Sequence, residues 1–310
     1  MDKNSISVII PSFNGYKLLK EYLPYTFDVV SHSRSVSDFE IIVIDDASTD
    51  ETVAYINTLD IPNLILIVND VNSGFSKTIN KGIARAKMDY CLLLNNDMEL
   101  PTDFFEQTLP LFSDDSVFGV CTEIRDRAGE RIIEGRKLPF FKHHELRYHE
   151  TIDAQNGNTF YLCGGNAVVD TRKIKNLNGF NELFSPFYFE DLDLSLRAWR
   201  KGWKCLYINS TYCKHTPSST IRKENDNLYV NKIFVRNRML LNYLHNSWLD
   251  NTILMVRICV KCFWYRFYRN AEKRNFIESA KGFFAVKKEA NRCREKEYEL
   301  LNPLDLTVFK

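Results

Sequence analysis

Two clusters of polar side chains, each placed directly after a short apolar run, are the residues best suited to chemistry. Asp45 and Asp46 follow the apolar residues 41–44, and the triplet at 95–97 follows residues 91–94. Such runs are typical of strands that are buried on both faces of a parallel sheet. In an open α/β sheet the ligand lies outside the carboxyl ends of the strands, so both clusters would meet at one edge. Carboxylates there suit a divalent cation and the phosphates that it neutralises. The pattern predicts a nucleotide site.

The elements that must position these side chains alternate between strand and helix over the first hundred residues. We expect strands at 7–10, 41–44, 64–68 and 90–94, with helices at 16–30, 51–59 and 75–86 between them. Right-handed crossovers place strands connected in this way in a single parallel sheet. The predicted fold class is therefore α/β, with a doubly wound, Rossmann-like and mostly parallel sheet.

Further along the chain the pattern is looser. We expect a helix at 104–111, strands at 118–121, 160–163 and 167–169, an amphipathic helix at 190–201 and a short strand at 206–208. The charged and aromatic residues 125–158 show little periodicity, so hairpins and loops are expected there. His215 would lie in a polar stretch after the last strand, and everything beyond residue 225 is predicted to be helical.

The composition narrows the functional classes. The 310 residues are 45% hydrophobic and 26% charged, and 41 basic against 40 acidic residues give a net charge of +1, so no nucleic-acid partner is expected. The eight scattered cysteines fit reduced thiols in the cytoplasm better than a disulfide framework. No stretch approaches the roughly 18 apolar residues of a membrane span. We therefore expect a cytoplasmic protein.

Six motifs in a fixed order resemble the family 2 glycosyltransferases over residues 5 to about 240. They are Pro11 to Asn14, Asp45-Asp46, Asn72 to Gly74, Asn95-Asn96-Asp97, residues 189–194 and the late His215. The resemblance implies the GT-A fold, inverting transfer from a nucleoside-diphosphate sugar, a divalent metal (Mn²⁺ or Mg²⁺), and a saccharide or lipid-linked saccharide acceptor, as in cell-surface polysaccharide synthesis. It implies a catalytic domain at 1–225, with a nucleotide-sugar part to about 120 and an acceptor part beyond, followed by a helical extension at 226–310.

The donor site that the resemblance implies takes a UDP- or dTDP-type sugar. Its residues would be Pro11, Phe13, Asn14, Asp45, Asp46, Asn72, Gly74, Asn80, Asn95 and Asn96. A carboxylate after the second strand can accept hydrogen bonds from a base N–H or a ribose hydroxyl, and the family places Asp45 there. Ordinary turn chemistry would also place an aspartate at this point.

The metal site would be built around the third residue of the triplet. The triplet occupies the D-x-D position of the family, but only Asp97 offers a negative charge, so Asn95 and Asn96 are expected to contact the sugar or the ribose. One carboxylate suffices for a Mg²⁺ that is also bound by phosphates and water. A single histidine is a weak signal, yet the resemblance implies that His215 completes this site. An imidazole ligand suits Mn²⁺ at least as well as Mg²⁺.

The catalytic base is expected at the start of the amphipathic helix. Acids are common in a first helical turn, so Glu190 and Asp191 alone prove little. Inverting transfer needs a carboxylate that accepts the proton of the acceptor hydroxyl, and the family places it at Asp191, with Glu190 positioning the acceptor.

The sequence Gly164-Gly165-Asn166 would let the backbone approach a sugar closely, so these residues are also assigned to the acceptor. A plain tight turn is the alternative.

The C-terminal third is the basic part of the chain. Apolar and aromatic residues at 253–268 alternate with Arg257, Lys261 and Arg266 at helical spacing, which fits a helix that lies on an anionic membrane surface. That would place the protein peripherally on the cytoplasmic face. The alternative is a helix packed on the catalytic domain or on a second subunit, which would make the protein an oligomer.

Two rival functions remain. A nucleotidyltransferase also uses a metal and a doubly wound sheet, but residues 11–15 are not the glycine-rich, basic phosphate loop that it usually carries after the first strand. A non-catalytic scaffold that binds nucleotide sugars is left open by the weakened triplet.

Overall fold

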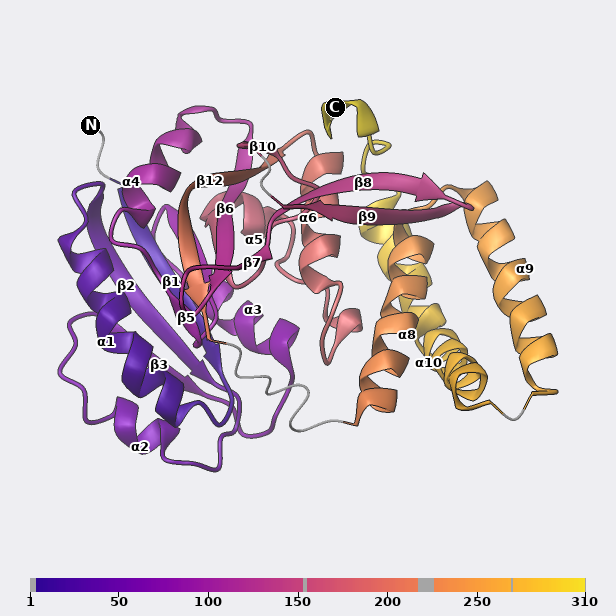
Figure 1. The fold of residues 1–310 in the computed structure, drawn as a ribbon, viewed down its shortest axis with the longest axis horizontal. Helices are drawn as coiled ribbons and strands as arrows, with labels where there is room; N and C mark the ends of the chain where they lie inside the picture. The colour runs from indigo at the N-terminus through magenta and orange to yellow at the C-terminus, as the bar shows by residue number, and fades with distance from the viewer. Residues whose placement is uncertain (1–3, 153–154, 217–225, 269, 310) are drawn as a thin grey trace.

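The computed structural model describes residues 4–152, 155–216, 226–268 and 270–309, and it is built on one ten-stranded sheet (Figure 1). The strands β1 (Asn4–Ser12), β2 (Val36–Asp45), β3 (Leu64–Val68) and β4 (Tyr90–Leu94) pair in parallel in the order β3-β2-β1-β4. The four strands expected from the apolar runs are therefore confirmed.

Alternating side chains of these strands pack into two separate hydrophobic cores, one on each face of the sheet. Ile42 and Ile44 of β2 pack with Ile79 of α3 (Phe75–Arg85), on one face of the sheet. Ile41 and Val43 pack with Leu19 of α1 (Tyr16–His32), on the other face. Successive side chains of a strand point to opposite faces, so a strand covered by helices on both sides must be apolar throughout. The doubly wound α/β prediction is confirmed, with a short α2 (Thr52–Ile56) between β2 and β3.

Three further strands extend the sheet beyond β4. The strand β11 (Asn166–Asp170) is antiparallel to β4 and to β6 (Val117–Asp126), and β12 (Lys204–His215) runs parallel to β6. Three short strands also pair with this sheet: β5 (Met98–Glu99), β7 (Ile132–Glu134) and β10 (Gly157–Asn158). Two longer strands, β8 (Arg136–Lys142) and β9 (Glu145–Thr151), form a separate hairpin. The helical turns of this region are α4 (Phe104–Thr108), η1 (Leu109–Ser113), α5 (Thr171–Asn176), η2 (Glu182–Phe184) and α6 (Glu190–Arg200).

Two expectations about strands are wrong. Residues 160–163 form no strand, because the Phe160 amide donates to the Lys137 carbonyl (2.8 Å) and the Leu162 amide to Ser195 Oγ (3.0 Å), which leaves no regular ladder. The last strand does not end at residue 208. A register shift between Ile208 and Tyr212 lets two exposed polar residues bulge outward, after which pairing with β6 resumes as far as His215.

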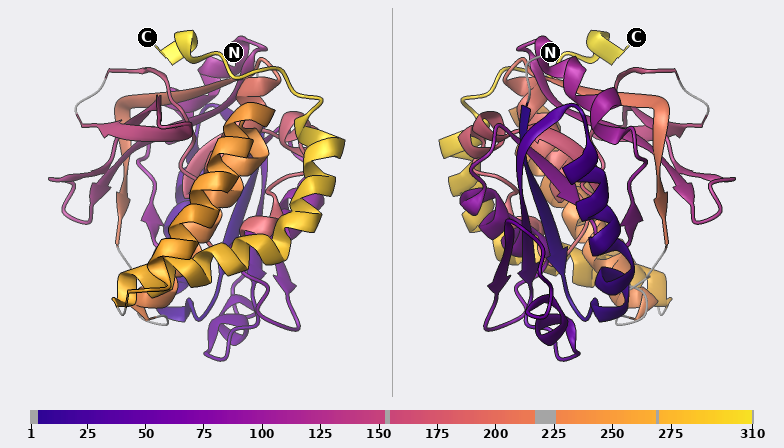
Figure 2. Two further views of the ribbon diagram at one scale, coloured as in Figure 1. Left: turned by 90° about the vertical axis from the view of Figure 1, so that its right-hand side faces the viewer. Right: turned by 90° about the vertical axis from the view of Figure 1, so that its left-hand side faces the viewer.

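The C-terminal segment is helical, as predicted, and lies beyond α6 (Figures 1 and 2). It comprises α8 (Asn227–His245), α9 (Trp248–Tyr265), α10 (Ala271–Cys293), the π-helical turn η3 (Arg294–Tyr298) and η4 (Leu306–Phe309). Buried side chains of α8, among them Met239 and Leu240, belong to the same core as α3, α6 and the sheet. None of the helices in the described residues is long and apolar enough to cross a membrane.

Candidate active site

The two polar clusters meet at the carboxyl edge of the sheet. Ser12, the last residue of β1, is in register with Asp45 at the end of β2, and its Oγ accepts a hydrogen bond from Asn96 Nδ2 (3.0 Å). The next turn contains Gly15, where a β-carbon would lie 2.2 Å from Ser12 Oγ and 2.4 Å from Asn96 Nδ2. Only glycine fits there without displacing both side chains. The structure therefore brings the ends of β1, β2 and β4 together, as the sequence pattern predicts.

The neighbouring carboxylates of Asp45 and Asp46 have different surroundings. Asp46 accepts from Asn69 Nδ2 (2.8 Å) and from the amides of Ser73 (2.9 Å) and Gly74 (2.9 Å), so both of its oxygens hold the loop before α3. Asp45 accepts from the Ser48 amide (3.0 Å), and its Oδ1 has no hydrogen-bond partner among the described residues. An unmatched buried acceptor is costly, which makes Asp45 the member of the pair with capacity left for a ligand. Its side chain is wholly buried.

The loops around this edge hold the other proposed donor residues. Asn14, with a φ of 48°, donates its amide to Ser48 Oγ (2.8 Å) and accepts from the Thr49 amide (2.9 Å), which ties the loops after β1 and β2 together. Pro11 and Phe13 are half-buried beside it.

The loop before α3 begins with the exposed Asn72 and turns at Gly74, where φ is 79°. The proposed donor residue Asn80 lies further along α3. Its amide donates to the Phe180 carbonyl (2.9 Å) and its carbonyl accepts from the Phe180 amide (2.8 Å). Asn80 therefore fixes α3 to the segment before η2.

Asp97 and His215 are brought together from positions 118 apart in the chain, with Asp97 Oδ2 and His215 Nε2 separated by 3.1 Å. His215 is in register with Met98, the residue after Asp97. Burial favours a neutral His215, but the hydrogen bond and the charge of Asp97 outweigh it and raise the imidazole pKa. The pair fits two ligands of a divalent cation whose other ligands are phosphates and water. Among the described residues no group of three or more His, Cys, Asp or Glu side chains could hold a metal ion.

The two glycines at 164 and 165 lie against residues of both sites. A β-carbon on Gly165 would be 2.7 Å from Asn95 Nδ2, and one on Gly164 would be 3.6 Å from Asp191 Cβ. The third residue of this motif, Asn166, is fully buried, and its Nδ2 donates to the Thr122 carbonyl (3.0 Å). The two glycines therefore lie between the Asn95 side-chain amide and Asp191, the proposed base. The Asn166 side chain holds β11 to β6.

Asp191 lies half-buried in the first turn of α6, where its Oδ1 accepts from the Leu192 amide (2.7 Å). Burial, reinforced by the charge of Glu134, raises the Asp191 pKa to about 6, against the lowering effect of the Leu192 amide and Lys137. Burial and the charge of Asp191 also raise the pKa of Glu190 well above its usual value, and Glu190 Oε2 has no partner among the described residues. A carboxylate with a pKa near 6 is ionised at neutral pH and is basic enough to accept a proton from a hydroxyl.

An ion pair beside this carboxylate, with one buried member, is absent from our sequence predictions. Lys137 Nζ lies 2.7 Å from Glu134 Oε2, and the side chains of Lys137 and Glu134 are 4% and 38% exposed. Tyr161 packs edge-on against Tyr148 with ring centroids 5.0 Å apart, and burial followed by the charge of Asp191 raises its pKa. Glu134, Lys137 and Tyr148 belong to the region that lacks periodicity, so no pattern in the sequence could have placed them next to Asp191.

Helix α8 holds the loop that leads into α6. The buried Asn237 Nδ2 contacts the carbonyls of Phe184 (2.6 Å), Phe187 (2.9 Å) and Tyr188 (2.9 Å). That loop ends at Phe189, with a φ of 75°, directly before the two acids. Sequence reasoning missed this contact, because Asn237 looks like any polar residue on an amphipathic helix.

A second buried contact joins α6 to the C-terminal helices. Asp193 pairs with Arg197 Nε (2.9 Å), and also accepts from His245 Nε2 (2.9 Å) and the Tyr298 hydroxyl (2.7 Å). Burial lowers the pKa of His245, so its imidazole is neutral at physiological pH. Helix α6 is thus linked to α8 and to η3 through one carboxylate.

Comparison with known proteins agrees with the resemblance to family 2 glycosyltransferases seen in the sequence. Residues 7–177, more than half of the chain, match the profile of glycosyl transferase family 2. The O-antigen chain rhamnosyltransferase WbaN of Salmonella anatum is 25% identical over 238 residues, which cover 71% of this chain and 69% of that protein. Glucomannan 4-beta-mannosyltransferase 9 of Arabidopsis thaliana is 24% identical over 200 residues, 60% of this chain but only 37% of the plant protein.

Solved structures share the fold at low identity. TarS residues 1–349 of S. aureus in complex with UDP-GlcNAc superposes with a TM-score of 0.61 at 15% identity, covering 94% of this chain and 85% of that one. The mannosyltransferase PcManGT of Pyrobaculum calidifontis, solved with GDP-Man and Mn²⁺, gives 0.57 at 14% identity, with 96% and 80% covered. The fold is therefore GT-A, and the profile match shows that the chain belongs to glycosyl transferase family 2.

Proposed function

We propose that this chain is an inverting, metal-dependent glycosyltransferase. It would move a sugar from a UDP- or dTDP-type donor to a saccharide or lipid-linked saccharide acceptor, in cell-surface polysaccharide synthesis. The observation that carries the proposal is the position of Asp191, whose carboxylate has a pKa of about 6 and lies beside Gly164, on the same edge as the Asp97–His215 pair. The relative WbaN is an O-antigen chain rhamnosyltransferase, which supports this choice.

In the proposed donor site, Asp45 would accept hydrogen bonds from the base or the ribose, while Asn95 and Asn96 would contact the ribose or the sugar. Asp97 and His215 would hold Mn²⁺ or Mg²⁺, which neutralises charge on the departing diphosphate when bound. Asp46 and Asn80 would support the site indirectly, since their polar atoms hold the loops around it. The other donor residues named from the sequence would line those loops.

In the proposed reaction, Asp191 accepts the proton of the acceptor hydroxyl while that oxygen forms the bond to the anomeric carbon. The bond from this carbon to the diphosphate breaks at the same time, so the configuration inverts and no covalent enzyme intermediate forms. Glu190, Gly164 and Gly165 would position the acceptor, and Asn166 would act through its backbone because its side chain is buried. The acceptor part would lie between about residue 121 and residue 225.

The test is incubation of the purified chain with several nucleotide sugars and Mn²⁺, followed by product analysis. We expect slow release of the nucleoside diphosphate. NMR of the products should show a sugar of inverted anomeric configuration. A product with retained anomeric configuration would refute the inverting mechanism. Release of pyrophosphate from a nucleoside triphosphate and a sugar phosphate would favour a nucleotidyltransferase, and donor binding without any turnover would favour a scaffold.

We also propose that the chain acts in the cytoplasm and contacts the membrane surface peripherally through its C-terminal helices, which would form an extension from about residue 226. The support is the C-terminal end of α9 and the turn that follows it, where Phe263, Trp264 and Phe267 are 54%, 58% and 67% exposed. A patch of this kind marks an interaction surface for a membrane or a protein, and a second subunit is the alternative.

A further inference from the structure

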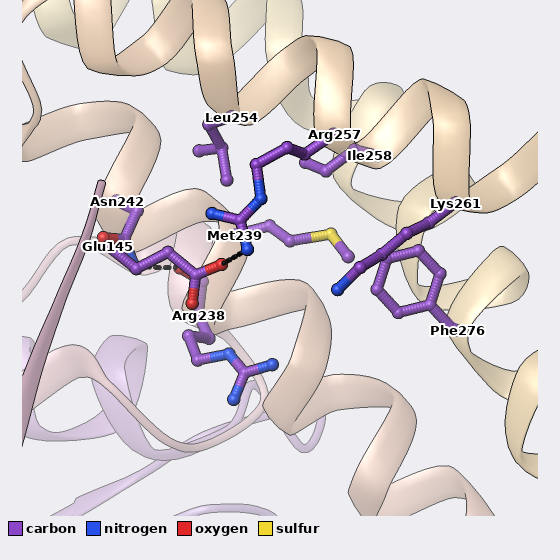
Figure 3. A pocket seen from close by; sticks show the side chains of 9 residues that line it. All are labelled: Glu145, Arg238, Met239, Asn242, Leu254, Arg257, Ile258, Lys261 and Phe276. Carbon is purple, nitrogen blue, oxygen red and sulfur yellow. Dashed lines mark hydrogen bonds and ion pairs between the residues drawn. The ribbon is translucent and has the colours of Figure 1, made fainter. Parts of the chain in front are cut away.

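A cavity lies outside the candidate active site, where the tip of the β8–β9 hairpin meets α8 and α9 (Figure 3). Its apolar lining comes from Met239, Leu254, Ile258 and Phe276. Its charged lining comes from Glu145, Arg238, Arg257 and Lys261, so three cations face one carboxylate. Neither the sequence motifs nor the proposed transfer reaction uses these residues.

The single carboxylate of this cavity is already shared between two arginines. Glu145 Oε2 lies 2.8 Å from an Arg147 nitrogen, and Glu145 Oε1 lies 3.4 Å from an Arg257 nitrogen. Arg238 is half-buried, and no carboxylate lies within 4.0 Å of its guanidinium in the part of the chain that the structure describes. Burial lowers the Arg238 pKa. A guanidinium that is partly removed from water and has no carboxylate within ion-pair distance is unfavourable, and a bound anion would offset that cost.

The walls of the cavity are held in place by hydrogen bonds of the hairpin tip. Asn242 Oδ1 accepts from the Leu146 amide (2.7 Å), and His144 Nδ1 lies 2.8 Å from Asp250 Oδ1. Arg257 donates to the His143 carbonyl. Because the cations come from two helices that the hairpin tip connects, the site needs little rearrangement to take a ligand.

An exposed apolar stripe on α9 adjoins the cavity. Val256, Val260 and Phe263 are separated by helical steps of three or four residues and are 57%, 49% and 54% exposed, and Phe267, in the turn after α9, is 67% exposed. Arg257 and Lys261 each follow a member of this stripe by one residue, so the cationic side of the helix lies next to the apolar side. On an interfacial helix this arrangement puts the cations at the level of lipid headgroups.

We propose that this cavity binds the phosphate group of a membrane lipid, while the α9 stripe inserts among the acyl chains. Guanidinium groups pair with phosphate oxygens in a forked geometry, and the Lys261 ammonium adds a point charge. A free phosphate ester has the same headgroup chemistry, but only a lipid also covers the adjoining apolar stripe. This inference rests on the membrane contact proposed above and does not depend on the transfer chemistry.

The test measures co-sedimentation of the full-length chain with vesicles of phosphatidylcholine, with or without phosphatidylglycerol. The variants are Arg238→Gln and Lys261→Gln in the cavity, and Arg266→Gln on the exposed end of the same helix as the matched control. Removing one charge near an anionic surface weakens partitioning roughly fivefold. Loss of a directly bound phosphate should instead weaken it at least about tenfold in the two cavity variants. Equal losses in all three variants, or no binding of the unmodified chain at low salt, would overturn the proposal.

A second arm separates the lipid from a soluble phosphate. Calorimetry with glycerol 3-phosphate and with inorganic phosphate should show weak binding compared with the phosphatidylglycerol vesicles. Tight soluble binding together with vesicle binding that does not depend on Arg238 would assign the cavity to a soluble ligand and refute the lipid. Donor hydrolysis without vesicles should be unchanged in Arg238→Gln and Lys261→Gln, so a failure of the transferase proposal can be told apart from a failure of this one.

Discussion

At the scale of single residues, the two carboxylates that begin α6 have different surroundings. Asp191 is half-buried with a pKa raised to about 6, whereas Glu190 is buried, with a pKa that burial and the charge of Asp191 raise, and has an unmatched oxygen. Two adjacent acids in a poorly hydrated site resist simultaneous ionisation. One of them therefore keeps a proton under conditions in which the other can accept one.

We expect Asp191→Asn to abolish sugar transfer while donor affinity stays within about twofold. The amide keeps the shape of the side chain but cannot accept a proton, and a general base contributes roughly a hundred- to ten-thousandfold to the rate. Turnover assays and calorimetry with the donor would show this. The exposed Asp60→Asn is the matched control and should behave as the unmodified chain. Normal turnover in folded Asp191→Asn would exclude this residue as the base.

Transfer should also decline as the pH falls through about 6, because protonation removes the basic form of Asp191, whose pKa is raised above its usual range. The decline should follow one proton in a profile of kcat/KM against pH. A rate that stays constant well below this pH would contradict the assignment, provided that thermal denaturation shows the fold to be intact there.

Asp97 and Asp45 should affect nucleotide binding in different ways. Asp97→Ala is expected to weaken UDP binding only when Mn²⁺ is present, since this carboxylate would act through the cation. Asp45→Ala should weaken UDP binding with and without the metal, because its hydrogen bonds would go to the base or the ribose. Calorimetry with and without Mn²⁺ measures both effects. The same metal-dependent deficit in the two variants would refute this division.

At the scale of elements, α8 fixes the geometry of a site to which it contributes no reacting group. Arg236 donates to the carbonyls of Leu183 (3.1 Å) and Ser185 (2.5 Å), next to those held by Asn237. The loop that precedes the two acids is therefore bonded along much of its length to one helix. Correct placement of a base within a fraction of an ångström has a large influence on rate.

We expect Asn237→Asp to lower kcat by on the order of a hundredfold while donor affinity is kept. The carboxylate is similar in shape but cannot donate to the three carbonyls, so the loop should shift and carry Asp191 with it. Single-turnover kinetics and donor calorimetry separate the two effects. Asn231→Asp, on an exposed position of the same helix, provides the control. Equal losses of donor affinity and turnover would point to general unfolding instead.

The elements that could be predicted are those whose residue pattern alone indicates how deeply they are buried. The strands β3 and β4 begin and end where their apolar runs do. In β4, burial on both faces leaves little freedom in residue type, whereas β3 is an edge strand that is only partly buried. The region around Glu134 and Lys137 could not be predicted, since the buried Lys137 ammonium is neutralised by a carboxylate that no sequence pattern pairs with it. The same holds for the proposed site: Asp191 is visible in the sequence at the start of a helix, but the groups that raise its pKa are not.

At the scale of the whole molecule, the helical extension and the sheet share one core. Met239, Leu240 and Leu244 of α8 are buried with Leu194 and Leu196 of α6. Burial of a leucine contributes roughly 2 kcal/mol, so α8 accounts for a large share of a typical net stability. The proposed domain boundary at residue 225 is not a boundary in packing, because α8 packs against α6 across it.

A chain that ends at residue 225 should therefore be less soluble and should lose its cooperative thermal transition, and donor binding with it. Removing α8 and the helices after it exposes the apolar side chains of α6 and leaves Asp193 without two of its three partners. Circular dichroism melts of the truncated and full-length chains measure the difference. A matched control is truncation after residue 304, which removes only η4. A truncated chain that melts like the full-length one would show that the catalytic part folds alone.

The buried carboxylate of Asp193 also constrains how the protein is made. Its salt bridge to Arg197 can form as soon as α6 emerges from the ribosome, but His245 follows 52 residues later and Tyr298 follows 105 residues later. Until the last of these partners is synthesised, the second oxygen of Asp193 faces the space that η3 will fill. Helix α6, which carries the proposed base, therefore has all of its Asp193 contacts only after residue 298 has been translated, and a shorter nascent chain contains every proposed site residue without the last contact that holds this helix.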